Sequence, residues 1–181
     1  GRLPEPEEIL EVVEAVSSKK DLEGLKILVT AGPTVEPIDP VRFITNRSTG
    51  KMGYAIAGAA ARRGAGVTLI SGPTNIRPPS GVEMRPVRSA EEMRSAVLES
   101  FSGCDMVIKA AAVSDYRPAM FLEEKMKKGP QHLVLEMVKN PDILAEIGLL
   151  AGRETERRQR VLVGFAAETE NVLENAKKKL L

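Results

Sequence analysis

Two stretches decide the fold: KILVTAGPT (residues 26–34) and NRSTGKMGYAIAGAA (46–60). The first is typical of a buried strand that ends in a glycine-containing turn, and the second of a polar glycine turn that opens a helix of small residues. Unpaired N–H groups at the start of a helix and the helix dipole both favour an anion. We therefore expect these segments to form a cradle for a nucleotide or another phosphorylated ligand.

Strands and helices alternate along the rest of the chain. The apolar patterns predict strands over 67–70, 82–87, 105–112 and 161–166, and helices over 8–16, 52–63, 89–101, from Asn140 onward and from 168 to the end. Ser89 and Asn140 are expected to cap the helices that begin there. Such alternation predicts an α/β fold, a Rossmann-like three-layer sandwich whose mostly parallel sheet has helices on both faces. Residues 116–139 lack a helical period and are expected to project as a flap or arm. Right-handed crossovers place the strand ends at one edge, where ligands bind.

Composition excludes several functional classes. The formal net charge is +1 and aromatic residues make up only 3% of the chain, with no Trp, so we expect neither nucleic acid nor a membrane as partner. No signal peptide or membrane-spanning segment is apparent. The single cysteine, Cys104, excludes an internal disulfide framework, which fits a cytoplasmic protein.

Known nucleotide motifs match this turn poorly. A Walker A loop requires Ser or Thr after Gly50-Lys51, where Met52 stands. A dinucleotide fingerprint requires three glycines directly after the first strand, but Ser48 replaces the first glycine, and residues 31–45 intervene. The second strand ends in serine and glycine instead of a ribose-binding acid. An NAD(P)-binding, short-chain-dehydrogenase-like oxidoreductase therefore remains only an alternative.

A further reading rests on motifs in order along the chain. The chain resembles phosphopantothenoylcysteine synthetase, the synthetase half of the bacterial bifunctional coenzyme A biosynthesis protein. The motifs that carry the resemblance are TAGPT (30–34), EPIDPVR (36–42), N-x-STGKMG (46–53), AAVSDYR (111–117), KMKK (125–128), MVKNPD (137–142) and GFAAET (164–169). The resemblance implies a linker and N-terminal helix over 1–24 and a nucleotide-binding synthetase domain over 25–181, excised from a longer protein and cut short at its C-terminus.

The family's chemistry sets expectations for ligands. The resemblance implies a ligase that joins 4′-phosphopantothenate to L-cysteine, with CTP as a substrate and Mg²⁺ as cofactor, through an acyl-cytidylate intermediate. Neither step needs a protein nucleophile, because the attacking carboxylate is already ionised at pH 7. The site must instead position two anions and neutralise their repulsion. A homodimer is expected, within a larger assembly when a decarboxylase domain is attached.

The resemblance also implies roles for individual residues. Asn46 and Lys125 are the catalytic candidates, Asn46 by donating to the intermediate's carbonyl oxygen and Lys125 by reaching CTP from a flap. Arg42, Asn46 and Ala112 are expected to bind phosphopantothenate; metal ligands stay unassigned. The residues expected to contact the nucleotide are Gly32, Ser48, Thr49, Gly50, Gly53, Ala111, Asp115, Lys125, Phe165 and Ala166.

Ordinary structural roles compete with several of these assignments. Asn46 can simply cap a helix or form a turn, Arg42 can form a surface salt bridge, and Asp115 can be a turn aspartate. Phe165 can be part of the core. These alternatives stay open on the sequence alone.

Overall fold

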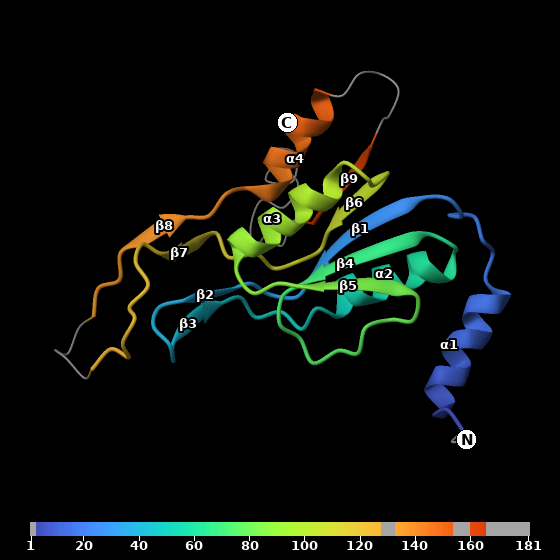
Figure 1. Cartoon of the computed structure of the whole chain (residues 1–181), viewed down its shortest axis with the longest axis horizontal. Helices are drawn as coiled ribbons and strands as arrows, with labels where there is room; N and C mark the ends of the chain where they lie inside the picture. The colour runs from blue at the N-terminus through green and yellow to red at the C-terminus, as the bar shows by residue number, and fades with distance from the viewer. Residues whose placement is uncertain (1–2, 128–132, 154–159, 166–181) are drawn as a thin grey trace.

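The computed structural model describes residues 3–127, 133–153 and 160–165. Its centre is a five-stranded parallel sheet in the order β5-β4-β1-β6-β9 (Figure 1). The strands are β1 (Lys26–Ala31), β4 (Gly66–Ser71), β5 (Val82–Pro86), β6 (Met106–Lys109) and β9 (Val161–Gly164). The order reverses between β1 and β6, which makes this the doubly wound, Rossmann-like arrangement expected from the sequence.

Helices cover both faces of the sheet. On one face α2 (Lys51–Arg62) packs Tyr54 and Ala57 onto the apolar side chains of β1 and β4. On the other, α3 (Ala90–Phe101) and α4 (Ile143–Gly152) bury Met93 and Ile147 in a second cluster, which also contains Cys104. The predicted three-layer sandwich is confirmed.

Two short antiparallel hairpins project from the sheet, to the left in Figure 1. One pairs β7 (Tyr116–Pro118) with β8 (Met137–Lys139), which confirms the projecting arm. The other pairs β2 (Val35–Pro37) with β3 (Phe43–Thr45) and was not predicted. Three-residue strands with prolines at or beside them carry no strand period, so sequence patterns miss them.

The start of α4 corrects a prediction. Asn140 does not cap this helix: its side chain is buried, donates to the carbonyl oxygen of Ser114 (2.8 Å) and accepts from the Arg117 guanidinium (2.8 Å). Asp142 is the cap, and its carboxylate accepts from the amides of Leu144 (3.0 Å) and Ala145 (3.1 Å). The last strand ends at Gly164, and the helix predicted from 168 lies outside the described residues.

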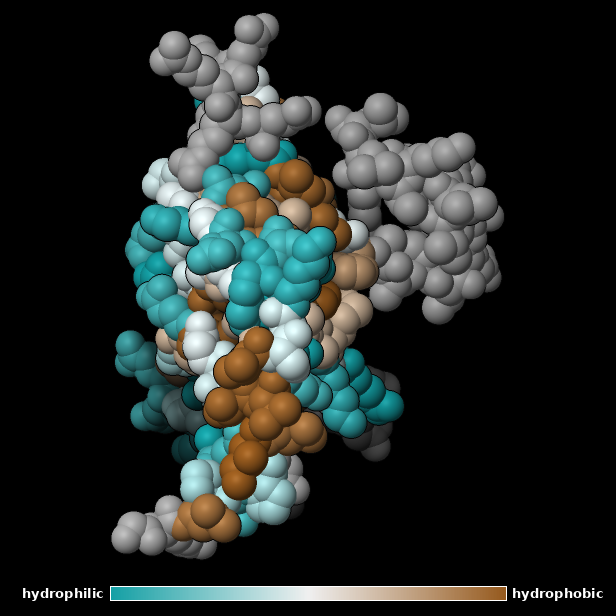
Figure 2. Space-filling model, turned by 90° about the vertical axis from the view of Figure 1, so that its right-hand side faces the viewer, coloured by the Kyte–Doolittle hydropathy of each residue, from teal (hydrophilic) through white to brown (hydrophobic). Residues whose placement is uncertain are grey.

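The N-terminal helix α1 (Pro6–Ser17) lies beside α2, held by ion pairs Arg62–Glu14 (3.5 Å) and Arg77–Glu8 (2.7 Å). Its apolar side chains face outward, and Figure 2 shows them as a brown strip on this end of the molecule; the exposed ones are Ile9, Leu10, Val12, Val13 and Val16. The domain boundary between residues 24 and 25 stays a prediction. Among the helices of the described residues, none has the length and apolar character needed to cross a membrane.

Candidate active site at the carboxyl edge of the sheet

The start of α2 forms an open cradle at this edge. Its N-cap residue, Gly50, has a left-handed backbone (φ 78°) and no side chain, so no side-chain acceptor occupies the first-turn amides. Residues 47–53 line a cavity of about 270 Å³ together with Ala110. The Gly50 amide donates to the Ser48 hydroxyl (3.3 Å), but no side chain caps the helix amides that follow it. Together with the positive end of the helix dipole, these amides suit a phosphate. Sequence reasoning missed Ala110, although it lies in the same small-residue run as Ala111 and Ala112.

Close packing against β1 requires the glycines of this cradle. A Cβ atom on Gly53 would lie 2.5 Å from the Ala31 Cβ atom. Gly32, at the end of β1, also has a left-handed backbone (φ 71°), and a Cβ atom there would lie 2.9 Å from the Thr74 Cγ2 atom. Without side chains at these positions, the start of α2 can sit directly against the strand end.

Asn46 contacts the end of β6. Its side-chain amide nitrogen donates to the carbonyl oxygens of Ala112 (3.3 Å) and Val113 (3.1 Å). The amide nitrogen is therefore engaged with these two carbonyls in this conformation. The predicted catalytic Asn46 and the predicted substrate-binding Ala112 therefore lie side by side. Asn46 could donate to a bound acyl group only if its side chain turned away from these carbonyls.

The chains leaving β1 and β6 stay paired beyond the sheet. The Ala112 amide donates to the Gly32 carbonyl (2.9 Å), and the Thr34 amide donates to the Ala112 carbonyl (3.3 Å). The Ala111 amide donates to the Thr30 hydroxyl (3.2 Å). Because both alanine amides are occupied, any contact of Ala111 or Ala112 with a ligand would use carbonyl or methyl groups.

Arg42 is bound to a buried acid. Its guanidinium donates to Asp39 (3.1 Å) and to the Met126 carbonyl (3.2 Å). Burial alone raises the pKa of the Asp39 carboxyl, but hydrogen bonds from three backbone amides and the Arg42 charge outweigh it and hold the pKa below its ordinary value. Asp39 is therefore ionised at neutral pH. The Arg42 side chain is still 42% exposed, which leaves its outer face open to an anion.

Lys125 lies in the exposed segment 122–127, next to the hairpins. Within the described part of the chain, no hydrogen bond or ion pair joins Lys125 to the cradle at 47–53. Its predicted approach to the nucleotide stays a prediction.

The other predicted nucleotide residues are placed less completely. Asp115 is exposed at the end of the β6 loop, and its carbonyl accepts from the Asn140 amide (2.8 Å). Phe165 follows β9 and is 49% exposed, so it is not the core residue that the sequence allowed. Ala166 lies outside the described residues. β6 and β9 are neighbours in the sheet, and the grouping of Asp115 with Phe165 beyond them stays a prediction.

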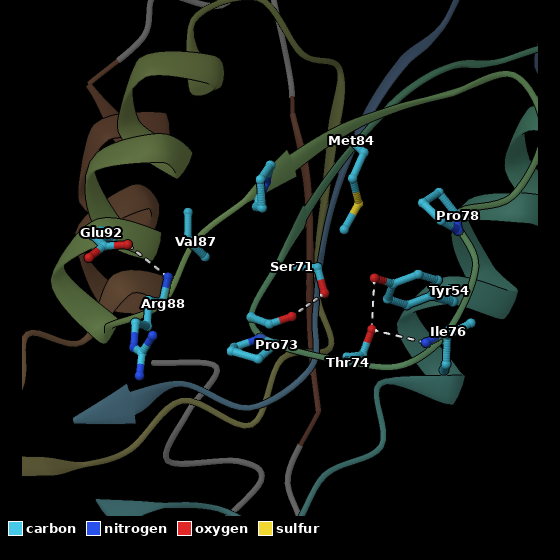
Figure 3. A pocket seen from close by; sticks show the side chains of 12 residues that line it. Tyr54, Ser71, Pro73, Thr74, Ile76, Pro78, Met84, Val87, Arg88 and Glu92 are labelled. Atoms are coloured by element: carbon cyan, nitrogen blue, oxygen red, sulfur yellow. Dashed lines mark hydrogen bonds between the residues drawn. The ribbon is translucent and has the colours of Figure 1, made fainter. Parts of the chain in front are cut away.

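A second cavity, of about 490 Å³, lies at the ends of β4 and β5 (Figure 3). Two of its polar side chains bond one another, since Thr74 donates to the Tyr54 hydroxyl (2.9 Å), and the Ser71 hydroxyl donates to the Gly72 carbonyl (2.8 Å). Dinucleotide enzymes place a ribose-binding acid at this strand end, where Ser71 and Gly72 stand. The cavity therefore does not favour a dinucleotide.

Comparison with known proteins assigns the family. Residues 22–181 match the family described as the DNA/pantothenate metabolism flavoprotein C-terminal domain. The chain belongs to this family. The resemblance that the sequence motifs indicated is thereby confirmed, and the alternative of a short-chain-dehydrogenase-like oxidoreductase finds no support in these similarities.

Two curated relatives are longer than this chain. It is 48% identical over 184 residues to the Bacillus subtilis (strain 168) "Coenzyme A biosynthesis bifunctional protein CoaBC", covering 99% of this chain and 44% of that protein. The protein of the same name from Haemophilus influenzae (strain ATCC 51907 / DSM 11121 / KW20 / Rd) is 49% identical over 181 residues, with coverage of 99% and 44%. The chain thus spans less than half the length of these relatives.

A solved structure also matches. The crystal structure of the C-terminal domain of coenzyme A biosynthesis bifunctional protein CoaBC superposes with a TM-score of 0.75 at 47% identity, covering 90% of this chain and 74% of that one. The match supports the Rossmann-like fold of this chain.

Proposed function

We propose that the chain is a phosphopantothenate–cysteine ligase domain that uses CTP. One observation carries the proposal: the uncapped N-terminus of α2 opens on a cavity beside the Asn46–Ala112 contact, in a chain 48% identical to a bifunctional coenzyme A biosynthesis protein. A triphosphate needs free donors, and an acyl group needs a polar side chain nearby. Both lie at one edge of the sheet.

Two displacements would make up the reaction. In the first, the carboxylate oxygen of 4′-phosphopantothenate attacks the α-phosphorus of CTP, and the bond to the departing pyrophosphate breaks. In the second, the cysteine amine attacks the acyl carbonyl of the cytidylate, CMP leaves, and the amine loses a proton. Catalysis consists of alignment and charge neutralisation.

The cradle supplies the nucleotide side of the site. Amides of 50–53 and the hydroxyls of Ser48 and Thr49 are assigned to the triphosphate. Gly32 and Ala111 leave room for the nucleotide at the ends of β1 and β6. Phe165 and Ala166 are assigned to the nucleoside, and Asp115 to the nucleotide hydroxyls or to a cation.

Three side chains serve the phosphopantothenate side. Arg42 binds its phosphate through the exposed face of the guanidinium, and Ala112 leaves space for the pantothenoyl chain. Asn46 turns from the Ala112 carbonyl to donate to the acyl oxygen as it becomes an oxyanion. Lys125 approaches the triphosphate from the 122–127 segment.

Mg²⁺ fits this site as an ion carried mainly by the nucleotide. No cluster of three acidic, histidine or cysteine side chains occurs among the described residues, and Mg²⁺ is usually held by one or two carboxylates plus substrate phosphates. Asp115 is the exposed carboxylate at this edge that would hold it. When bound, the ion would neutralise phosphate charge.

A homodimer is proposed through the hairpins. The described hairpin region carries large apolar side chains in solvent, a pattern that marks an interaction surface; they are Phe43 (50% exposed), Tyr116 (54%), Met120 (72%), Phe121 (52%) and Val134 (91%). Sedimentation equilibrium should give a dimer, and Val134→Glu should shift it toward monomer. Assembly with an attached decarboxylase domain stays a prediction.

A half-reaction assay tests the proposed function. The chain is mixed with CTP, Mg²⁺ and 4′-phosphopantothenate without cysteine, and pyrophosphate release is measured. Release that requires phosphopantothenate supports carboxylate activation, and adding cysteine should then release CMP. Absence of pyrophosphate, or calorimetric preference for NADPH over CTP, would reject the ligase.

A further inference from the structure

Asp39 is a buried acid that no role assigned so far explains. It is 2% exposed, in the turn between β2 and β3. Its Oδ1 atom accepts from the amides of Val41 (2.8 Å) and Arg42 (2.7 Å). Its Oδ2 atom accepts from the Arg42 guanidinium (3.1 Å) and from the Met126 amide (3.1 Å). A buried carboxylate is tolerated when its lone pairs are satisfied in this way.

The Met126 contact crosses from the β2–β3 turn to the segment that carries Lys125. Arg42 also donates to the Met126 carbonyl (3.2 Å), so both backbone polar groups of Met126 are held. The Leu122 amide donates to the Ile38 carbonyl (2.9 Å), which adds a second point of attachment. The residue directly after Lys125 is therefore fixed by one acid and its arginine.

We propose that Asp39 is a positioning residue that sets the places of Arg42 and Lys125 together. The proposal rests on the ligase function proposed above, in which Arg42 meets phosphopantothenate and Lys125 meets CTP. Asp39 holds the guanidinium of Arg42 directly and the backbone beside Lys125 through Met126. One carboxylate thereby fixes the relative placement of two cations assigned to two different substrates.

The alternative is that Asp39 only stabilises a turn. Its two bonds to Val41 and Arg42 amides would suffice for that role. The hydrogen bonds that Asp39 accepts from the Arg42 guanidinium and from the Met126 amide are not needed to form the turn. A test must therefore measure the 122–127 segment and its coupling to Lys125, not stability alone.

Hydrogen exchange tests the structural part. Asp39→Asn replaces one acceptor oxygen by an NH₂ group, which is a donor. The asparagine side chain therefore cannot accept hydrogen bonds at both positions, from the turn amides and from the Met126 amide. In the peptide covering 122–127, exchange at Met126 is expected to become at least about ten-fold faster, since the amide loses its acceptor. Asp21→Asn is the matched control, because Asp21 pairs with an arginine, Arg63 (2.8 Å), before β1. It should leave this peptide unchanged.

Arg42→Lys is a second variant in case Asp39→Asn fails to fold. An ammonium cannot present the fixed fork that bridges Asp39 and the Met126 carbonyl. The Asp39 bond to the Met126 amide remains. Exchange at Met126 should therefore fall between the unmodified chain and Asp39→Asn. Exchange as slow as in the unmodified chain in every folded variant at Asp39 or Arg42 would overturn the proposal.

A double-mutant cycle tests the catalytic part. Asp39→Asn is expected to lower kcat for pyrophosphate release about ten-fold when Lys125 is present and to change it less than about two-fold in Lys125→Gln, because residues that act through each other are not additive. Additive losses would overturn positioning of Lys125. If the unmodified chain released no pyrophosphate, the ligase function would fail, while Met126 exchange alone would still decide whether Asp39 fixes this segment.

Discussion

Gly50 lies against Gly32 so closely that a Cβ atom on Gly50 would come within 3.3 Å of the Gly32 backbone nitrogen. The same atom would lie 2.8 Å from the Thr74 Cγ2 atom. The start of α2 thus packs against the end of β1 and the β4 loop, at a point where neither Gly50 nor Gly32 carries a side chain. The direction of the cradle amides depends on this contact.

Gly50→Ala is expected to weaken CTP binding about ten-fold and to lower the free energy of unfolding by about 2–3 kcal/mol, because left-handed strain adds to overpacking. Calorimetric titration and urea unfolding measure the two effects. Gly81→Ala is the control, since Gly81 also has a positive φ (74°) but no atom within 4 Å of its added Cβ. It should cost about 1 kcal/mol from strain and leave CTP affinity unchanged. If Gly50→Ala and Gly81→Ala lost CTP affinity equally, the contact of Gly50 with Gly32 would not be what orients the cradle amides.

Asn46→Asp is expected to slow the second half-reaction more than the first. A carboxylate cannot donate to the acyl oxygen, and its charge opposes the oxyanion, so amide formation should fall about 10²-fold. Quenched-flow measurement of pyrophosphate and of the cysteine adduct separates the steps. Asn75→Asp, an exposed asparagine outside the site, supplies the control. Equal loss of both steps would argue against the oxyanion role.

Lys125→Gln should slow pyrophosphate release about 10²-fold, because it removes a charge assigned to the triphosphate. The free energy of unfolding should change by less than about 0.5 kcal/mol, as is usual for an exposed side chain. Lys127→Gln tests specificity, since Lys127 is also exposed on the same segment. If Lys125→Gln and Lys127→Gln slowed pyrophosphate release equally, the loss would come from the positive charge of the segment as a whole and not from Lys125 itself.

Glu146 should make stability depend on pH through its pair with Arg94 (2.6 Å for both hydrogen bonds). The hydrogen bond from Arg94 holds the pKa of Glu146 below its ordinary value, although burial opposes it. Its contribution is therefore complete above the unfolded pKa of about 4.5 and is lost as pH falls through the lower folded value.

In the corresponding variant, Glu146→Gln, the free energy of unfolding should be lower by roughly 1 kcal/mol at pH 7. In strong acid it should equal that of the unmodified chain, because Glu146 is then protonated. Urea unfolding at several pH values measures the difference. Glu99→Gln, in a more exposed pair with Arg85, should change stability less. A Glu146→Gln deficit that stayed constant down to pH 2 would contradict this linkage.

Local patterns predicted the sheet and its helices because burial on both faces leaves a nearly continuous apolar run in each strand. Ser89 also capped α3 as predicted, with its hydroxyl accepting from Glu92. The pattern failed where tertiary contacts decided the outcome. Asn140 has the right residue type for a helix cap, but burial against Ser114 and Arg117 gives it another role.

The candidate site divides in the same way. The glycine turn at 48–53 is local, so its sequence predicted the open start of α2 directly. The contact of Asn46 with Ala112 spans 66 positions, and that of Asp39 with Met126 spans 87. No periodicity encodes such pairs, and only the assembled sheet and hairpins bring them together. The family resemblance supplied Asn46 and Lys125 as candidates, whereas it gave no role to Asp39.

The backbone pairing of Gly32 and Thr34 with Ala112 has a consequence for the size of cofactor that this scaffold accepts. In other doubly wound proteins the space between these two strand ends is a trench, across which a dinucleotide lies. Here backbone hydrogen bonds bridge the trench, so a ligand bound at this edge would lie on its rim, to one side of the bridge. A mononucleotide on one side and a short second substrate on the other suit such a divided rim, and an extended redox cofactor does not.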